Sequence, residues 1–160
     1  MHSVARWVVF VVVMVLFAGS PAGAAGPYDL SPEGNARYLA DYAARKDVTK
    51  MASGLMYRVL QSGSGTSPVS RFDTVTVEYQ GWLVNNRIFD RSRPQEPTTF
   101  VVGGVIPGWT EALMKMKVGD QWQIVVPANL GYGENGMNNI IPPNQTLVFL
   151  IRLVKVEYAP

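Results

Sequence analysis

A glycine-rich segment is the part of the sequence whose spacing most directly suggests a chemistry. Residues 131–136 read GYGENG and satisfy the pattern G-x-G-x-x-G, in which glycines let the backbone approach a pyrophosphate. That chemistry requires a strand before the glycines and a helix directly after them. A strand fits the preceding QWQIVVP, but two prolines follow at 142–143 and no helix can begin where the motif needs one. We therefore interpret the segment as a long surface loop that brings Tyr132, Ile140 and Ile141 to the rim of a site.

The residue types that carry out most covalent and metal-dependent catalysis are missing. The sequence has no Cys, and its single His is His2, inside the N-terminal segment described next. A Ser-His-Asp triad, a thiol nucleophile, thiol redox chemistry and a His- or Cys-ligated zinc site are therefore excluded from the rest of the chain. Carboxylates are scattered singly, so we expect no metal and no cofactor.

The first 24 residues have the pattern of a secretory signal peptide. Arg6 precedes the apolar run WVVFVVVMVLF, and Ala22 and Ala24 fit the small-residue positions of a cleavage site. The run is too short to cross a bilayer comfortably as a helix, although an uncleaved N-terminal anchor is the alternative. Cleavage after Ala24 would leave thirteen basic and twelve acidic residues, a net charge of +1. We predict a periplasmic or secreted protein without a stable membrane anchor after cleavage, and without a nucleic-acid partner.

Two short helices are expected. Ser31 is a typical N-cap, because a proline at the first helical position and an acid in the first turn follow it. Residues 33–46 then have a helical period, and we interpret them as a packing or spacer helix rather than a partner surface. A second helix is predicted to begin near Pro107 and to end by Gly119. The apolar face expected for the first helix consists of Ala36, Leu39, Ala40 and Ala43.

Four segments alternate with the period of half-buried strands: 55–60, 73–84, 121–128 and 146–158. In the second of them, Val75, Val77 and Tyr79 share one face. In the last, one face carries Leu147, Phe149, Ile151 and Leu153. Many strands and one central helix favour an α+β fold with an antiparallel sheet packed on a helix.

Five segments in this order and spacing resemble the FKBP-type peptidyl-prolyl cis/trans isomerase domain over about residues 52–157: VTVEYQGWL, IFDRS, VIPGWTEALMKMKVGD, GYGENG and IIPPNQTLVFLIRLVKVE. The preceding NARYLADYAARKDVTKMASGLMYRVLQSGSG resembles the lead-in of the secreted bacterial macrophage infectivity potentiator group. The resemblance implies a curled antiparallel sheet of about five strands wrapped around one short helix, with a short N-terminal helix. We divide the chain into a signal peptide (1–24), a linker with a short helix (25–50) and an isomerase domain (51–160). The long dimerising region of that group is missing, so we expect a monomer.

The resemblance implies an enzyme that accelerates rotation about X-Pro bonds of exported proteins in an apolar aromatic pocket, with no covalent intermediate. Proline-containing polypeptides are the expected partners, and macrolides of the rapamycin class the expected inhibitors. Trp109 would form the floor under the proline ring. The aromatic walls would be Tyr79, Phe89 and Phe149, and the substrate-binding sides Val105, Ile106, Ile140 and Ile141. Trp82 and Trp122 fall outside the family's pocket positions and are taken as packing residues.

Two polar groups complete the implied site. In the family pattern the residue matching Asp90 lies in the pocket near the tyrosine matching Tyr79, where its charge acts on the amide dipole. From the residues alone, an Asp after two apolar residues in a turn is more often a local cap. The Tyr132 hydroxyl would donate to one substrate carbonyl and the backbone N–H of Ile106 would hold another.

Several positions depart from the family pattern. Thr98 stands where a bulky aromatic often completes the pocket, Arg91 follows the key Asp, and Gly104 replaces an acid found in some members. Met137 and Asn138 alter the loop tip. These changes bear on the preference for the residue before proline and on macrolide affinity.

Two alternative functions remain open. The protein could be a periplasmic chaperone, or a module that binds a proline motif statically with little turnover.

Overall fold

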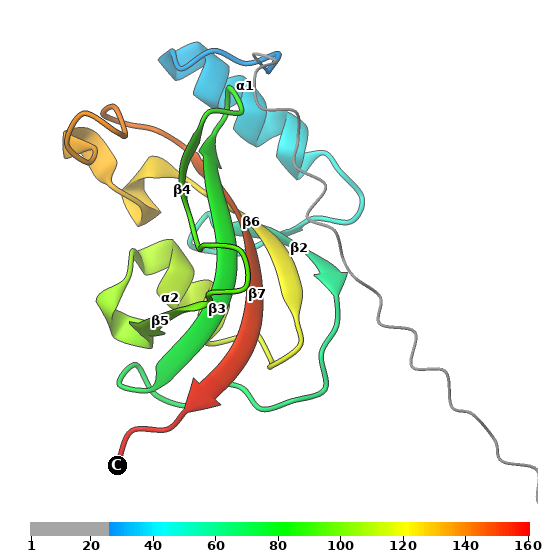
Figure 1. Cartoon of the computed structure of the whole chain (residues 1–160). Coiled ribbons are helices and arrows are strands. Elements are labelled where there is room, and N and C mark those ends of the chain that lie inside the picture. Colours follow the sequence, from blue (N-terminus) through cyan, green and yellow to red (C-terminus); the bar gives the residue numbers. More distant parts are fainter. Residues whose placement is uncertain (1–25) are drawn as a thin grey trace, which may run out of the picture.

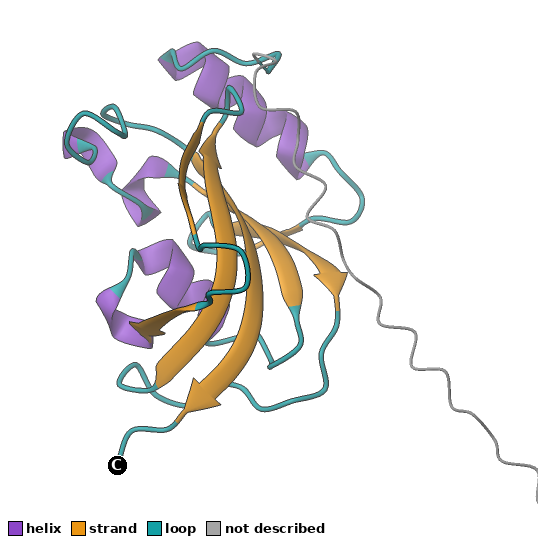
Figure 2. Cartoon of the chain, viewed as in Figure 1, coloured by secondary structure: helices purple, strands orange, loops and turns teal. Residues whose placement is uncertain are grey.

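The computed structural model describes residues 26–160, so the predicted signal peptide lies outside the described residues. One helix precedes five strands along the chain, and a second helix separates these from the last two strands (Figures 1 and 2). The helices are α1 (Pro32–Ala43) and α2 (Pro107–Leu113), and the strands are β1 (Thr49–Lys50), β2 (Met56–Gln61), β3 (Thr74–Leu83), β4 (Ile88–Arg91), β5 (Thr98–Val101), β6 (Gln121–Val126) and β7 (Leu147–Glu157). Turns of 3-10 helix occupy Val102–Gly104, Ala128–Leu130 and Gly133–Asn135.

The strands form one antiparallel sheet in the order β1-β2-β6-β7-β3-β4, and β5 also pairs with β3. The central strands β3 and β7 pair along their whole lengths, from Thr74 opposite Glu157 to Leu83 opposite Leu147. The edge of β3 is shared, because β5 pairs with its first half and β4 with its second. This confirms the predicted curled antiparallel sheet. It has seven strands, rather than the about five that the resemblance implies, and β1, β4 and β5 have only two to four residues each.

The two faces of the sheet bury different sets of side chains. The inner face, as we call the one against α2, carries the predicted alternation of β3 and β7, including Val75, Tyr79 and Phe149. The outer face carries Val125 and Val148, which pack with Tyr42 of α1. The long strands β2, β3, β6 and β7 therefore contribute residues to two separate apolar clusters, as the pleat requires.

Helix α1 begins as predicted, because the Ser31 side chain accepts a hydrogen bond from the backbone N–H of Gly34. Its buried face differs from the prediction. Asn35 and Tyr42 are buried, Tyr38 and Leu39 are half-buried, and the three alanines of the predicted face are exposed. Tyrosine rings bury far more apolar area than alanine methyl groups, so the helix turns its aromatic side toward the sheet. The exposed alanines are Ala36, Ala40 and Ala43.

A buried amide network fixes α1 to the C-terminal part of the fold. The Asn35 side chain accepts from the backbone N–H of Thr146 at 2.8 Å and donates to the Gln145 side chain at 3.2 Å. Gln145 in turn donates to the backbone carbonyls of Leu30 and Pro143. Asn35 and Gln145 are each only 6% exposed, so these hydrogen bonds satisfy groups that would otherwise be costly to bury.

Helix α2 begins at Pro107, where the fixed φ of proline suits the first helical position. The helix ends at Leu113, earlier than the predicted limit at Gly119, and a turn follows in which Gly119 has a φ of +95°. Its one buried side places Trp109, Ala112 and Leu113 against the inner face. Within residues 26–160 no helix has the length and apolar character needed to span a membrane.

Candidate active site

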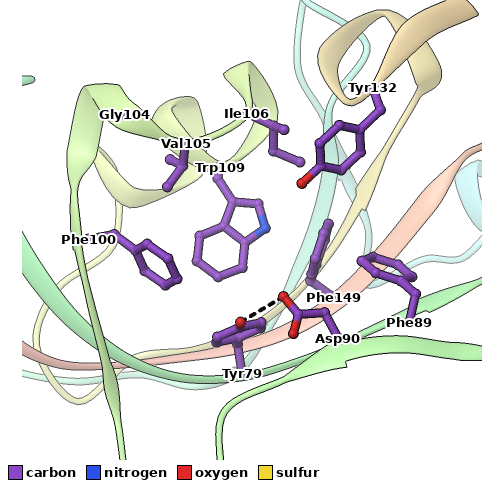
Figure 3. Close-up of a pocket in the computed structure, with 10 residues that line it drawn as sticks. All are labelled: Tyr79, Phe89, Asp90, Phe100, Gly104, Val105, Ile106, Trp109, Tyr132 and Phe149. Atoms are coloured by element: carbon purple, nitrogen blue, oxygen red, sulfur yellow. Dashed lines mark hydrogen bonds between the residues drawn. The ribbon is translucent and has the colours of Figure 1, made fainter. Parts of the chain in front are cut away.

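A pocket of about 400 Å³ lies between α2 and the inner face of the sheet (Figure 3). The residues that line it come from β3, β4, β5 and β7, from the start of α2 with the segment just before it, and from the loop after β6. Eight of the ten predicted site residues line it, and Phe100 and Gly104 line it in addition. The complete lining is Tyr79, Phe89, Asp90, Phe100, Gly104, Val105, Ile106, Trp109, Tyr132 and Phe149.

Trp109 forms the centre of an aromatic box. Its indole is 4% exposed and meets Tyr79, Phe149 and Phe100 edge to face, with ring centroids 5.2, 5.2 and 5.7 Å away. Edge-to-face contacts of this kind are favourable because the positive ring edge meets the negative ring face. They also hold the rings nearly perpendicular, at 80–86°, so that they act as floor and walls rather than as a stack.

Gly81 of β3 makes room for the second pair of rings. Phe149 lies opposite Gly81 in the β3–β7 register, and Phe89 meets Phe149 edge to face at 5.5 Å. A Cβ at Gly81 would lie 2.7 Å from the Phe149 ring and 2.8 Å from the Phe89 ring. The missing side chain therefore lets both rings rest against the backbone of the central strand.

A bulge in the β3–β4 pairing explains how two consecutive residues of β4 both line the pocket. Side chains normally alternate between faces along a strand. Here Gly81 pairs with Asp90 while Trp82 pairs with Ile88, so Phe89 is the extra residue of a β-bulge. Bulges re-aim side chains in this way and are frequent beside functional sites.

Asp90 accepts two hydrogen bonds. One oxygen, Oδ1, accepts from the backbone N–H of the next residue, Arg91, at 2.9 Å. The other, Oδ2, accepts from the Tyr79 hydroxyl at 2.8 Å, at the edge of the pocket (Figure 3). Burial of the ring, and secondly this hydrogen bond to the carboxylate, raises the pKa of Tyr79 above its ordinary value near 10. The hydroxyl therefore stays protonated and holds the carboxylate in place.

Tyr132 and Ile106 provide donors on the opposite side of the pocket. The Tyr132 ring lies above the box with its hydroxyl directed inward (Figure 3). Burial, and secondly the negative charge of Asp90, raises the pKa of Tyr132, so this hydroxyl also keeps its proton. Ile106 precedes α2, and its backbone N–H has no backbone acceptor within residues 26–160.

Ile140 and Ile141 do not line this pocket. Ile140 is 46% exposed, and its carbonyl accepts from the Arg87 guanidinium at 2.9 Å. Ile141 is 1% exposed and belongs to the apolar core. The loop after Tyr132 turns back on itself, since the N–H of Met137 donates to the carbonyl of Ile141. A direct substrate contact by either isoleucine stays a prediction, which the arrangement of this pocket does not favour.

Phe100 is the pocket residue that sequence reasoning missed. The family pattern often has an aromatic at the position of Thr98, and this sequence lacks it. In β5 the half-buried positions are Thr98 and Phe100, which share one face, and the phenyl ring two residues later reaches the pocket. The alternation along β5 could have indicated this, but four residues are too few for a clear pattern. Trp122 packs in the core and stacks on Tyr57 at 4.2 Å, outside the pocket.

No group of three or more His, Cys, Asp or Glu side chains within residues 26–160 is placed to hold a metal ion. The residues that line the pocket form an apolar, ring-walled cavity with one carboxylate and a few hydrogen-bond donors.

Comparison with known proteins gives a family with the same features. The family model for FKBP-type peptidyl-prolyl cis-trans isomerases matches residues 65–154, which contain every residue that lines the pocket. The chain belongs to this family. Within it, the relatives place the protein in the Mip-like bacterial group.

Two of these relatives show how far the similarity extends. The chain is 42% identical over 123 residues to the outer membrane protein MIP of Legionella longbeachae, covering 76% of this chain and 52% of that protein. It is 44% identical over 121 residues to the FKBP-type 22 kDa peptidyl-prolyl cis-trans isomerase of Escherichia coli K12, covering 75% and 58%. The chain thus spans about half the length of the curated relatives it matches.

Solved structures agree with this assignment. The crystal structure of FkpA from Escherichia coli superposes with a TM-score of 0.75 at 41% identity, covering 80% of this chain and 60% of that one. A peptidyl-prolyl cis-trans isomerase from Pseudomonas syringae gives a TM-score of 0.73 at 34% identity, covering 78% and 92%. The FKBP fold inferred from the sequence is therefore confirmed.

Proposed function

We propose that the protein is a peptidyl-prolyl cis/trans isomerase that accelerates rotation about X-Pro bonds of polypeptides. The observation that carries this proposal is the aromatic box around Trp109 with the Asp90–Tyr79 pair at its edge. The cavity of about 400 Å³ has room for a proline ring and its neighbouring peptide groups. Family membership supports the same activity.

The reaction needs no nucleophile, metal or proton transfer. Amide resonance keeps the X-Pro bond planar, with a barrier of about 18–20 kcal/mol, and the uncatalysed reaction takes roughly tens to hundreds of seconds. The twisted transition state has lost this resonance, so its carbonyl and nitrogen carry less charge separation than the planar amide. An apolar cavity that excludes water therefore disfavours the planar state more than the twisted one, and each 1.4 kcal/mol of that difference is about tenfold in rate.

The polar groups would orient the substrate around the rotating bond. The proline ring would lie on Trp109, with Phe149 and Phe89 as one wall and Tyr79 and Phe100 as another. Tyr132 and the N–H of Ile106 would hold two carbonyls, one on each side of the bond. Asp90, held by Tyr79, would act on the amide dipole through its charge. In this proposal Val105 and Ile106 provide the sides of the binding site.

We further propose that the protein works outside the cytoplasm on exported polypeptides. The support is the signal-peptide pattern of residues 1–24 and similarity to a protein named outer membrane protein MIP. The proposed domain division is 25–50 for the N-terminal helical segment and 51–160 for the isomerase domain. Because α1 packs on the outer face of the sheet, we expect the two parts to unfold together.

A protease-free assay on residues 25–160 tests the proposal. Turnover of a short peptide with one X-Pro bond, inhibited by a macrolide of the rapamycin class, is the expected result. Asp90→Leu should keep the fold, checked by circular dichroism, and lower turnover by about tenfold if its charge contributes about 1.4 kcal/mol. Unchanged turnover in this variant would reject the electrostatic role. A folded chain with neither turnover nor inhibition would favour a static proline-binding module or a chaperone.

A further inference from the structure

We propose that a second groove beside the pocket binds residues of the substrate polypeptide that flank the X-Pro bond. This inference rests on the proposed isomerase function and extends it from the single bond to the segment around it. The flanking groove, as we call it, has a volume of about 420 Å³. It is lined by Arg71, Gly103, Val105, Pro107, Thr110, Glu111 and Met114.

The flanking groove is continuous with the pocket. Val105 lines both, and the neighbouring glycines are divided between them, with Gly104 in the pocket and Gly103 in the groove. Neither glycine carries a side chain that would form a wall at the boundary. A polypeptide that leaves the pocket past Val105 therefore enters the groove within one or two residues, since an extended chain advances by about 3.3 Å per residue.

Exposed apolar side chains lie on the segments that contribute Arg71 and Gly103 to the groove. Phe72 is 78% exposed and directly follows Arg71, which lines the groove. Val69 and Val101 are 73% and 49% exposed. The segments that carry them lie together, because the N–H of Gly103 donates to the carbonyl of Arg71 at 2.8 Å. Single exposed apolar residues are ordinary, but these three lie on the two segments that contribute Arg71 and Gly103 to the groove, and we infer that they extend it with a surface suited to apolar ligands.

The turn that presents Phe72 is held firmly. Asp73 is 1% exposed, and its carboxylate accepts from the backbone N–H groups of Val69, Ser70 and Ala159 at 2.7–2.9 Å. These three hydrogen bonds connect the turn to the end of the chain. A side chain on a fixed backbone loses less conformational entropy on binding than one on a mobile loop, so Phe72 is a favourable anchor for an apolar partner.

Arg71 suits an extended polypeptide as the occupant. Two other polar residues of the groove are already engaged: Thr110 donates to the carbonyl of Val102, and Glu111 accepts from Ser53. Arg71 forms no ion pair with any residue from 26 to 160. Its guanidinium has five N–H donors and can bind the backbone carbonyls of an extended segment. Apolar side chains would then meet Phe72 and Val101.

Two substrates distinguish binding in the groove from binding in the pocket. A short peptide that consists only of an X-Pro pair with blocked ends fills the pocket alone, because it has no flanking residues, whereas an unfolded protein whose refolding is limited by prolyl isomerisation also reaches the groove. Phe72→Ser should leave turnover of the short peptide unchanged and lower the acceleration of refolding by about tenfold, the loss expected when one aromatic anchor no longer binds. Leu60→Ser is the matched control, since Leu60 is 45% exposed on β2, across the sheet from β5. It should change neither rate.

The inference is overturned if Phe72→Ser leaves both rates unchanged, lowers both alike, or affects refolding no more than Leu60→Ser does. Binding of a proline-free apolar peptide, measured by fluorescence anisotropy, provides a test that does not depend on turnover. It should be weaker for Phe72→Ser than for the unaltered chain, and equal binding counts against the groove. If the unaltered chain fails to isomerise the short peptide, the proposed function fails, while this binding measurement still decides whether the groove holds polypeptide.

Discussion

The inner and outer faces of the sheet are formed by the same strands but are covered differently. On the inner face, the 7-residue helix α2 places one indole near the sheet and leaves a cavity among the rings. On the outer face, the 12-residue helix α1 packs Tyr42 directly on Val125 and Val148, and its polar contacts include buried amides. The comparison shows that strand alternation supplies two apolar surfaces, and that the covering helix decides which of them keeps a cavity and which is filled.

The largest expected effect comes from removing the floor of the inner face. Trp109→Ala should destabilise the domain by about 3 to 5 kcal/mol, because a buried indole with three aromatic neighbours leaves a large void, and should abolish prolyl-ligand binding. Chemical denaturation and a ligand titration measure the two losses. Trp122→Ala is the control: it removes another buried indole of the same core but should leave ligand binding by the folded molecules intact. A fully stable Trp109→Ala variant would show that the indole is not the floor.

A smaller loss of stability and turnover is expected from a substitution at Gly81, where the backbone lies close to two rings of the inner face. Gly81→Ala should destabilise the protein by about 1 to 3 kcal/mol, the usual cost of overpacking. Turnover should fall as well, because Phe89 and Phe149 must move. Thermal unfolding and the peptide assay would measure both effects. If stability and turnover are unaffected, the rings do not depend on this contact.

On the outer face, Asn35→Ala should cost about 1 to 2 kcal/mol, because the backbone N–H of Thr146 and the Gln145 side chain lose a buried partner. Turnover per folded molecule should stay within about twofold if this face only supports the fold. Urea unfolding combined with the peptide assay distinguishes the two quantities. A large fall in kcat with little change in stability would mean that α1 influences the pocket and that the division between the faces is wrong.

The smallest effect is expected from pH. Tyr79 and Tyr132 have raised pKa values, so both hydroxyls keep their protons and turnover should be constant from about pH 7 to 9. Because the folded pKa of Tyr79 lies above its unfolded value, its stabilising contribution is complete below about pH 10 and is lost as the pH rises through the folded pKa. The denaturation midpoint should therefore fall less steeply above this pH for Tyr79→Phe than for the unaltered chain.

Sequence reasoning succeeded where patterns were long and failed where they were short. The alternation of β3 and β7 extends over ten and eleven residues, and it placed Tyr79 and Phe149 correctly on the inner face. The four-residue β5 has no readable period, so Phe100 was missed. The bulge that aims Phe89 and Asp90 into one pocket depends on the register with β3, which no local pattern encodes.

The prediction of the buried face of α1 failed for a different reason. Alanines at helical spacing suggested an apolar stripe, but side-chain size and the amide partners of Asn35 decided the orientation. Those partners, Gln145 and Thr146, lie 110 and 111 residues away in the sequence, so only the folded chain reveals them. Ile140 and Ile141 were expected at the rim from the loop pattern and at the binding site from the resemblance; they do not line this pocket, and their contact with substrate stays a prediction.

The central position of β7 has a consequence for how the protein is made. This strand lies between β6 and β3, so the part of the sheet formed by β1, β2 and β6 and the part formed by β3, β4 and β5 are not joined until residues 147–157 are available. The amides that hold α1 also await residues 145 and 146. During synthesis the sheet therefore closes only after β7 has been made, so its longest strand pairing, between β3 and β7, is among those that form late.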